Sequence, residues 1–189
     1  MGTSNRPAVF AALAQGLDLP QVLGRFGLTR EDLQKIFQEA AEHFGRQEGR
    51  QEQDFWRLYC DGASRGNPGP AGAGAVLYDP RGNLAAQASE FLGEATNNVA
   101  EYQALLLGLK LARDLKVPRL RLLADSQLLV RQLTGHYRVK SPHLIPLWQQ
   151  AIKELQSFEA CGIAHVPREE NREADALANR AIDHQSPPG

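Results

Sequence analysis

The spacing of hydrophobic and polar positions changes once along the chain, after a wholly polar stretch. Before it, apolar side chains recur every three or four positions, as in amphipathic helices. Gly27 is suited to end the first of two such stripes, and Thr29 with Asp32 forms a capping box that begins the second. We therefore predict a small all-α domain over residues 1–45, a helical hairpin with a short leading helix over 8–15.

The polar stretch covers residues 46–53 and contains no apolar side chain. A segment of this kind between two patterned regions is typical of a solvated linker. We therefore predict a second domain over residues 54–185, followed by a short tail over 186–189.

In the second domain the apolar positions first follow strand patterns and then alternate between helical and extended patterns. Three segments are expected to form antiparallel strands, with the turn Pro80–Asn83 joining the second strand to the third. The longest helical segment ends before Pro118. The expected strands cover residues 55–60, 73–79, 84–91, 120–124 and 162–166, and the expected helices cover residues 98–116, 126–133, 144–158 and 172–182.

This order of elements, βββαβααβα, indicates an α/β domain. Three strands in a meander, followed by strands that alternate with helices, predict a mixed five-stranded sheet with helices on both faces. The small all-α domain at the N-terminus is an addition to this architecture.

Charge and cysteine content narrow the possible functions. With 21 Lys and Arg against 22 Asp and Glu, the formal net charge is −1, so nucleic-acid contacts must come from local clusters, and a histone-like protein is excluded. We expect no membrane partner and a cytoplasmic location, because no apolar stretch is long enough for a membrane span or a secretory signal. Cys60 and Cys161 are too few for a disulfide framework or a zinc site, and we expect both in the core.

Four acidic residues stand where predicted strands end or predicted helices begin. Asp61 and Asp125 follow the first and fourth strands, and Glu101 and Asp175 lie near the starts of two helices. In a mixed sheet these ends can meet, so that the four carboxylates share one volume. Like charges at such distances repel unless a cation neutralises them. Oxygen ligands without Cys or His favour Mg²⁺ or Mn²⁺.

Two such ions, about 3.5–4 Å apart, could activate a water on one side of a phosphodiester and stabilise the leaving oxygen on the other. The acidic residues therefore indicate metal-assisted phosphodiester hydrolysis. Each acid also has a simpler interpretation: Asp125 as a helix cap, Glu101 as a first-turn charge on the helix dipole, Asp175 as a solvated helix residue, and Asp61 as a turn residue.

All four acids lie in ordered segments that resemble the signature motifs of the ribonuclease H type 1 family. The segments are DGASRGNPGPAGAG at 61–74, TNNVAEYQAL at 96–105, ADSQLLVRQL at 124–133 and PREENREADALA at 167–178. The resemblance extends from residue 55 to residue 182 and implies the ribonuclease H fold. It implies that the four acids bind two Mg²⁺ or Mn²⁺ ions in an endonuclease that cuts the RNA strand of RNA/DNA hybrids, leaving 5′-phosphate and 3′-hydroxyl ends.

The chain departs from that family in two places. Many members carry a His in a Gly-His-rich loop before the last acid, whereas here the loop is short and Arg168 or Glu169 stands in its place. We expect His165 to be a strand residue and not its substitute. The basic helical protrusion of many bacterial members is also missing. We expect activity to survive, because the metal ions carry most of the chemistry.

Substrate contacts are expected from polar and basic residues near these motifs. By the resemblance, Asn67, Asn97 and Asn98 align with amides that hydrogen-bond RNA 2′-hydroxyls, although they could also be turn or cap residues. The six Lys and Arg residues between 116 and 140 predict a phosphate-binding face, and an aromatic side chain among them could line the DNA channel. The expected substrate-binding residues are Asn67, Thr96, Asn97, Asn98, Ser126, Tyr137, Arg138 and Lys140.

Alternatives remain open for both domains. The second domain could be an inactive hybrid-binding module or a DNA-acting nuclease of the same superfamily. The first resembles a helix-turn-helix, but residues 1–53 carry six basic against seven acidic side chains, which argues against phosphate binding. Binding of a protein partner, self-association and contact with nucleic acid therefore all stay open for it.

Overall fold

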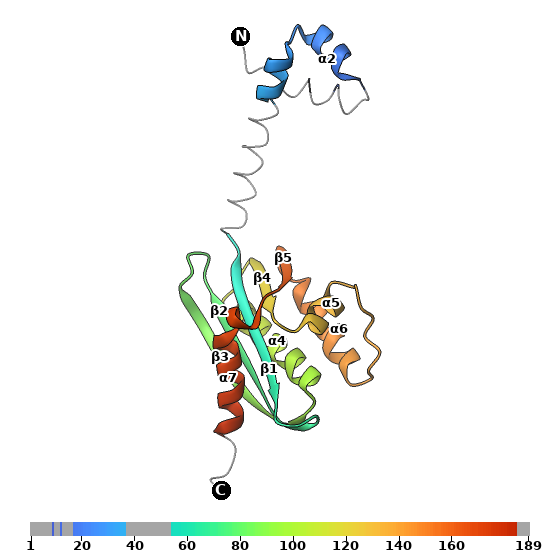
Figure 1. The fold of residues 1–189 in the computed structure, drawn as a ribbon. Coiled ribbons are helices and arrows are strands. Elements are labelled where there is room, and N and C mark those ends of the chain that lie inside the picture. Colours follow the sequence, from blue (N-terminus) through green and yellow to red (C-terminus); the bar gives the residue numbers. More distant parts are fainter. Residues whose placement is uncertain (1–8, 10–11, 13–16, 37–53, 185–189) are drawn as a thin grey trace. The chain divides into compact units, whose positions relative to one another are not determined.

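The computed structural model describes residues 9, 12, 17–36 and 54–184 (Figure 1). The chain divides into two units, Met1–Glu52 and Gln53–Gly189, and each is considered by itself. The predicted linker at 46–53 and the predicted tail at 186–189 lie outside the described residues. The boundary between the two units falls within the predicted linker.

The first unit contains the predicted helical hairpin as far as it is described. Helix α2, Leu19–Phe26, begins at an Asp18 capping box and ends at Gly27, which has a φ of 62°. Residues 30–36 are helical, and the predicted capping box at their start is present, because the Asp32 N–H donates to Thr29 Oγ1 at 3.1 Å. The buried side chains of this unit are Val9, Ala12, Val22 and Leu33. The rest of the predicted leading helix over 8–15, and residues 37–45 of the predicted hairpin, lie outside the described residues.

The second unit is built on the predicted mixed sheet of five strands, in the order β3-β2-β1-β4-β5. Strand β1 pairs with β2 antiparallel and with β4 parallel, and β4 pairs with β5 parallel. The sheet prediction is therefore confirmed. The strands are β1 Trp56–Ser64, β2 Gly69–Tyr78, β3 Leu84–Ala95, β4 Arg119–Ala124 and β5 Ala160–His165.

Helices cover both faces of this sheet, as predicted (Figure 1). The main core lies between the sheet and α4, α5 and α6, and α7 packs on the opposite face against β1, β2 and β3. A short 3₁₀ helix precedes α7 and was not predicted. The helices are α4 Asn97–Asp114, α5 Gln127–Leu133, α6 Leu144–Leu155, η2 Arg168–Glu170 and α7 Arg172–Asp183.

The glycine-rich segment after Asp61 consists of the end of β1, exposed bends at residues 65–68 and the start of β2. Strand β2 begins at residue 69 and not at 73, and it packs directly against α7. A Cβ at Gly74 would lie 2.2 Å from the Ala174 carbonyl oxygen, and one at Gly72 would lie 2.3 Å from the Ala178 carbonyl oxygen. The glycines therefore allow a helix to approach the strand.

Two further expectations need correction. Strand β1 continues to Ser64, so Asp61 lies within the strand and does not follow it. The parallel pairing of β1 with β4, however, stops at Tyr59. Asp61 is thus placed just beyond the point where the two strands stop pairing. Cys60 is buried as expected, but Cys161 is exposed, because β5 is an edge strand. Among the described residues, no helix combines the length and apolar character needed to cross a membrane.

Candidate active site

Three of the four predicted acids meet at one end of the sheet. Asp61 comes from β1, Glu101 from the first turns of α4, and Asp125 directly follows β4. One carboxylate oxygen of each lies within 4.8 Å of the others. Asp61 and Glu101 are each only 6% exposed, so this negative charge is largely removed from water.

The close approach of α4 to β1 depends on Gly62. A Cβ at this position would lie 2.1 Å from the Glu101 backbone nitrogen, so any larger residue would push the helix away. The Gly62 N–H also donates to the Glu101 carboxylate. Gly62 therefore serves the contact between helix and strand.

Burial and mutual repulsion disfavour ionisation of these acids. Burial, followed by the charges of Asp125 and Asp175, raises the pKa of Asp61 to about 8. Burial, followed by the charges of Asp61 and Asp125, raises the pKa of Glu101 to about 9. Glu101 Oε2 is buried and has no hydrogen-bond partner among the described residues. A hard divalent cation would satisfy this oxygen and offset the repulsion, so the oxygen-only donor set fits such an ion.

Asn171 completes the support of this cluster and was not predicted as a site residue. It is 1% exposed, and its Nδ2 donates to Asp125 Oδ1 at 2.8 Å and to the Cys60 carbonyl oxygen at 3.0 Å. It thereby fixes the orientation of the Asp125 carboxylate. The only sequence signal was its place in the fourth motif. His165 is the last residue of β5, as predicted, and its Nε2 lies 3.1 Å from the Asp125 carbonyl oxygen.

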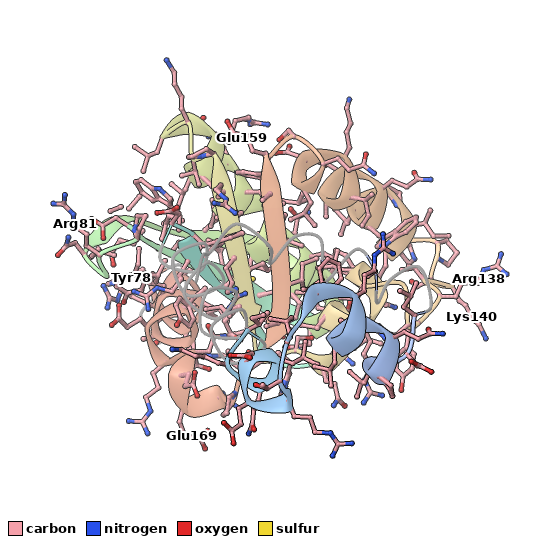
Figure 2. All side chains as sticks on the ribbon, turned by 90° about the horizontal axis from the view of Figure 1, so that it is seen from above. Tyr78, Arg81, Arg138, Lys140, Glu159 and Glu169 are labelled. Atoms are coloured by element: carbon pink, nitrogen blue, oxygen red, sulfur yellow. The ribbon has the colours of Figure 1, made fainter. Side chains whose placement is uncertain are left out.

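The fourth predicted acid, Asp175, lies outside the group of three. It is in the first turn of α7, and its Oδ1 accepts a hydrogen bond from Arg168 Nη2 at 2.7 Å. Its charge still helps to raise the pKa of Asp61. Of the two residues expected in place of the family His, Arg168 therefore contacts a predicted ligand, whereas Glu169 is exposed on η2 (Figure 2).

Several predicted substrate residues gather beside the start of α4. Asn67, Thr96 and Asn98 line a hollow of about 230 Å³. The Asn97 N–H donates to Asn67 Oδ1 at 3.2 Å, which joins the loop after β1 to the helix. Thr96 caps α4, and Ser126 caps α5 in the same way, so both hydroxyls have structural roles.

The predicted basic segment is divided between separate places. Arg131 lies over the Tyr137 ring, with 5.0 Å from its Cζ to the ring centroid, and it also donates to the Tyr137 hydroxyl, whereas two other arginines stack on Phe55. Tyr137 is 46% exposed. Figure 2 shows Arg138 and Lys140 extending outward, on the other side of the unit from Tyr78 and Arg81. The predicted basic residues thus lie at more than one place on the second unit, and phosphate binding by them stays a prediction.

Known proteins resemble this chain over the second unit. Residues 59–181 match a family described as reverse transcriptase-like. The ribonuclease HI of Halobacterium salinarum is 46% identical over 125 residues, which are 66% of this chain and 63% of that protein. A ribonuclease H of Coxiella burnetii is 36% identical, over 71% of this chain and 94% of that protein.

Solved structures agree with these sequence matches. The crystal structure of the Halobacterium salinarum RNase H1 superposes with a TM-score of 0.67 at 45% identity, covering 68% of this chain and 98% of that one. LC11-RNase H1, solved in complex with an RNA/DNA hybrid, gives a TM-score of 0.65 at 40% identity, covering 68% and 97%. Fold, motifs and matches agree, and the chain belongs to the ribonuclease HI family.

Proposed function

We propose that this protein is an endoribonuclease that hydrolyses the RNA strand of RNA/DNA hybrids and leaves 5′-phosphate and 3′-hydroxyl ends. The observation that carries the proposal is the buried cluster of Asp61, Glu101 and Asp125, in which one carboxylate oxygen has no partner among the described residues. The names of the relatives support the same activity, as does the hybrid in the LC11-RNase H1 structure.

The carboxylates are suited to hold two hard cations, Mg²⁺ or Mn²⁺. Asp61, Glu101 and Asp125 would hold one, and Asp175 would join Asp61 for the second once Arg168 releases it. When bound, such a pair supplies a water of lowered pKa and positive charge near the leaving oxygen.

The protein's own groups position these ligands and the substrate. Asn171 orients Asp125, and the Gly62 N–H orients Glu101. Arg168 carries a positive charge at the rim of the site, where a phosphate could replace Asp175 as its partner. The amides of Asn67 and Asn98 can both donate and accept, which suits recognition of an RNA 2′-hydroxyl.

A substrate panel tests the proposal. The purified protein is given labelled RNA/DNA hybrid, DNA duplex, RNA duplex and single-stranded RNA, with Mg²⁺ or with Mn²⁺. The expected result is cleavage of the RNA strand of the hybrid with 5′-phosphate on the downstream product. Cleavage of DNA duplex with the hybrid untouched would instead identify a DNA nuclease, and hybrid binding without cleavage under either metal would identify an inactive module.

A further inference from the structure

Helix α7 covers part of one sheet face in the second unit. It packs on β1, β2 and β3 and makes no contact of similar extent with β4 or β5. Leu122 of β4 is in the main core on the other face, so Arg119 and Arg121 point to the face of α7. Arg57 of β1 is the register partner of Arg121 and shares this face.

The arginines of this face are held in place. The Phe55 ring centroid lies 4.7 Å from Arg119 Cζ and 5.8 Å from Arg121 Cζ, which are cation–π distances. Arg121 also lies across Gly162 of β5, because a Cβ there would be 3.5 Å from its Nε. We call Phe55, Arg57, Arg119 and Arg121 the arginine shelf. Asp54 Oδ2 lies 3.7 Å from Arg119 Nη1.

A hollow of about 350 Å³ lies beside the shelf, between the sheet and the η2–α7 segment. Its lining includes Arg57 and the edge-to-face pair of Tyr59 and Tyr78, whose ring centroids are 5.8 Å apart. Glu169 and Glu173 also line it, and the Tyr78 hydroxyl donates to Glu173. Aromatic rings can stack on a nucleobase, and carboxylates accept hydrogen bonds from its exocyclic amino groups.

Shelf, hollow and active site lie along one strand. Phe55, Arg57, Tyr59 and Asp61 are alternate positions on the same face, with Asp61 in the metal cluster. Arg57 is four residues from Asp61, or ~13 Å along the strand. Cationic and aromatic side chains that alternate in this way are typical of surfaces that bind single-stranded nucleic acid.

We infer that a single strand extending from a duplex in the active site binds along β1, with a base at the two tyrosines and its phosphates on the arginine shelf. The acidic wall of the hollow repels phosphate, so the backbone must follow the arginine side. The inference rests on the proposed function only in placing a duplex at the active site.

The test compares hybrids with and without a single-stranded tail of about ten nucleotides, a length within the range of single-strand sites. Affinity is measured by fluorescence anisotropy on the Asp61→Asn protein, with tails at each of the four strand ends. At least one tail is expected to tighten binding about tenfold, or ~1.4 kcal/mol. Arg57→Ala/Arg121→Ala should remove this gain and reduce the salt dependence of log K by ~1.4, because two phosphate contacts are lost.

Two further variants separate the shelf from other effects. Tyr59→Leu should reduce the gain in affinity that a tail provides, without changing the salt dependence of log K. Arg113→Ala is the matched control, because this arginine pairs with Glu154 on α6, on the other face of the sheet, and it should keep the full gain. Thermal unfolding confirms that each variant is folded; if the double variant is not, Arg121→Gln replaces it.

The inference is overturned if no tail tightens binding, or if Arg113→Ala loses as much of the gain as the shelf variant. Cleavage of an untailed hybrid by the unmodified protein is measured separately and depends on the proposed function alone. If the protein cuts this hybrid but no tail tightens binding, the proposed nuclease activity stands and binding of a single strand on the arginine shelf is wrong.

Discussion

At the scale of single residues, the acids of the site are held in an environment that opposes their own charge. Asp61 and Glu101 are nearly buried, and each also feels the charge of Asp125. Such an arrangement costs stability in the metal-free protein and is compensated only when a cation arrives.

This environment predicts how the metal-free protein responds to pH. The folded pKa values of Asp61 and Glu101, about 8 and about 9, lie above their ordinary values, so the folded state binds more protons than the unfolded state. In EDTA the melting temperature should therefore fall as pH rises from about 4 to about 9. Mg²⁺ or Mn²⁺ should raise it more at the alkaline end, where protons no longer compete. Scanning calorimetry measures both, and a cation effect independent of pH would contradict the assignment.

Asn171 predicts a positioning effect on Asp125. Asn171→Ala removes the Nδ2 donor to Asp125 Oδ1 and should weaken metal affinity by about 10–100-fold, as measured by calorimetric titration with Mn²⁺. Asn179→Ala is the matched control, because its amide, in the helix that follows Asn171, donates to the Asp175 carbonyl oxygen and not to a carboxylate. If the two variants bind Mn²⁺ with equal affinity, Asn171 does not position a metal ligand.

The sequence was informative about residues with strong chemistry and less so about those that support them. Asp61, Glu101 and Asp125 were predicted because acids at element ends stand out in ordered motifs, and the structure brings them together. Asn171 was missed because its role depends on contact with Cys60, which is 111 residues away. The pairing of Asp175 with Arg168 likewise depends on the shape of η2, which no periodicity indicates.

At the scale of elements, the glycines of β2 determine how the sheet meets α7. Gly72 and Gly74 lie under helix backbone, so the strand and the helix pack without intervening side chains. The periodicity of apolar residues predicted which segments are helices and which are strands. It did not predict where β2 begins, because Gly and Pro usually indicate a turn. Here a helix packs on these glycines, and its residues lie about a hundred positions later in the chain.

This packing predicts an asymmetry between strand glycines. Gly74→Ala should lower the free energy of unfolding by ~1–3 kcal/mol, because its Cβ would collide with α7 backbone that has little freedom to move. Gly162→Ala is the control in β5, where the nearest atom to a new Cβ is 3.5 Å away, in ordinary van der Waals contact with the Arg121 side chain. Urea unfolding compares the two. If Gly74→Ala is no less stable than Gly162→Ala, the close contact between β2 and α7 is wrong.

At the scale of the whole molecule, two units have separate cores and the family match covers only one of them. Among the described residues, the buried cluster of the first unit shares no residue with the clusters of the second. The match at residues 59–181 lies wholly in the second unit. The polar stretch at residues 46–53 predicts a boundary in the same region of the chain.

Separate cores predict that the second unit works alone. A shortened protein starting at Gln53 should keep the melting transition of the second unit and the kcat for hybrid cleavage of the full chain. A rise in KM would indicate that the first unit contacts nucleic acid, and an assembly of fewer copies than the full chain forms would indicate self-association through it. Loss of the folded state would contradict the independence of the two units.

The most direct test of the central claim is the rate at which the Asp61→Asn variant cuts the RNA strand of a hybrid. Asp114→Asn, which changes an exposed acid at the end of α4, is the matched control. We predict that Asp61→Asn abolishes metal-dependent cleavage while hybrid binding stays nearly intact, and that Asp114→Asn cuts like the unmodified protein. An Asp61→Asn variant that cuts as fast as its parent would show that the buried carboxylates do not perform the reaction.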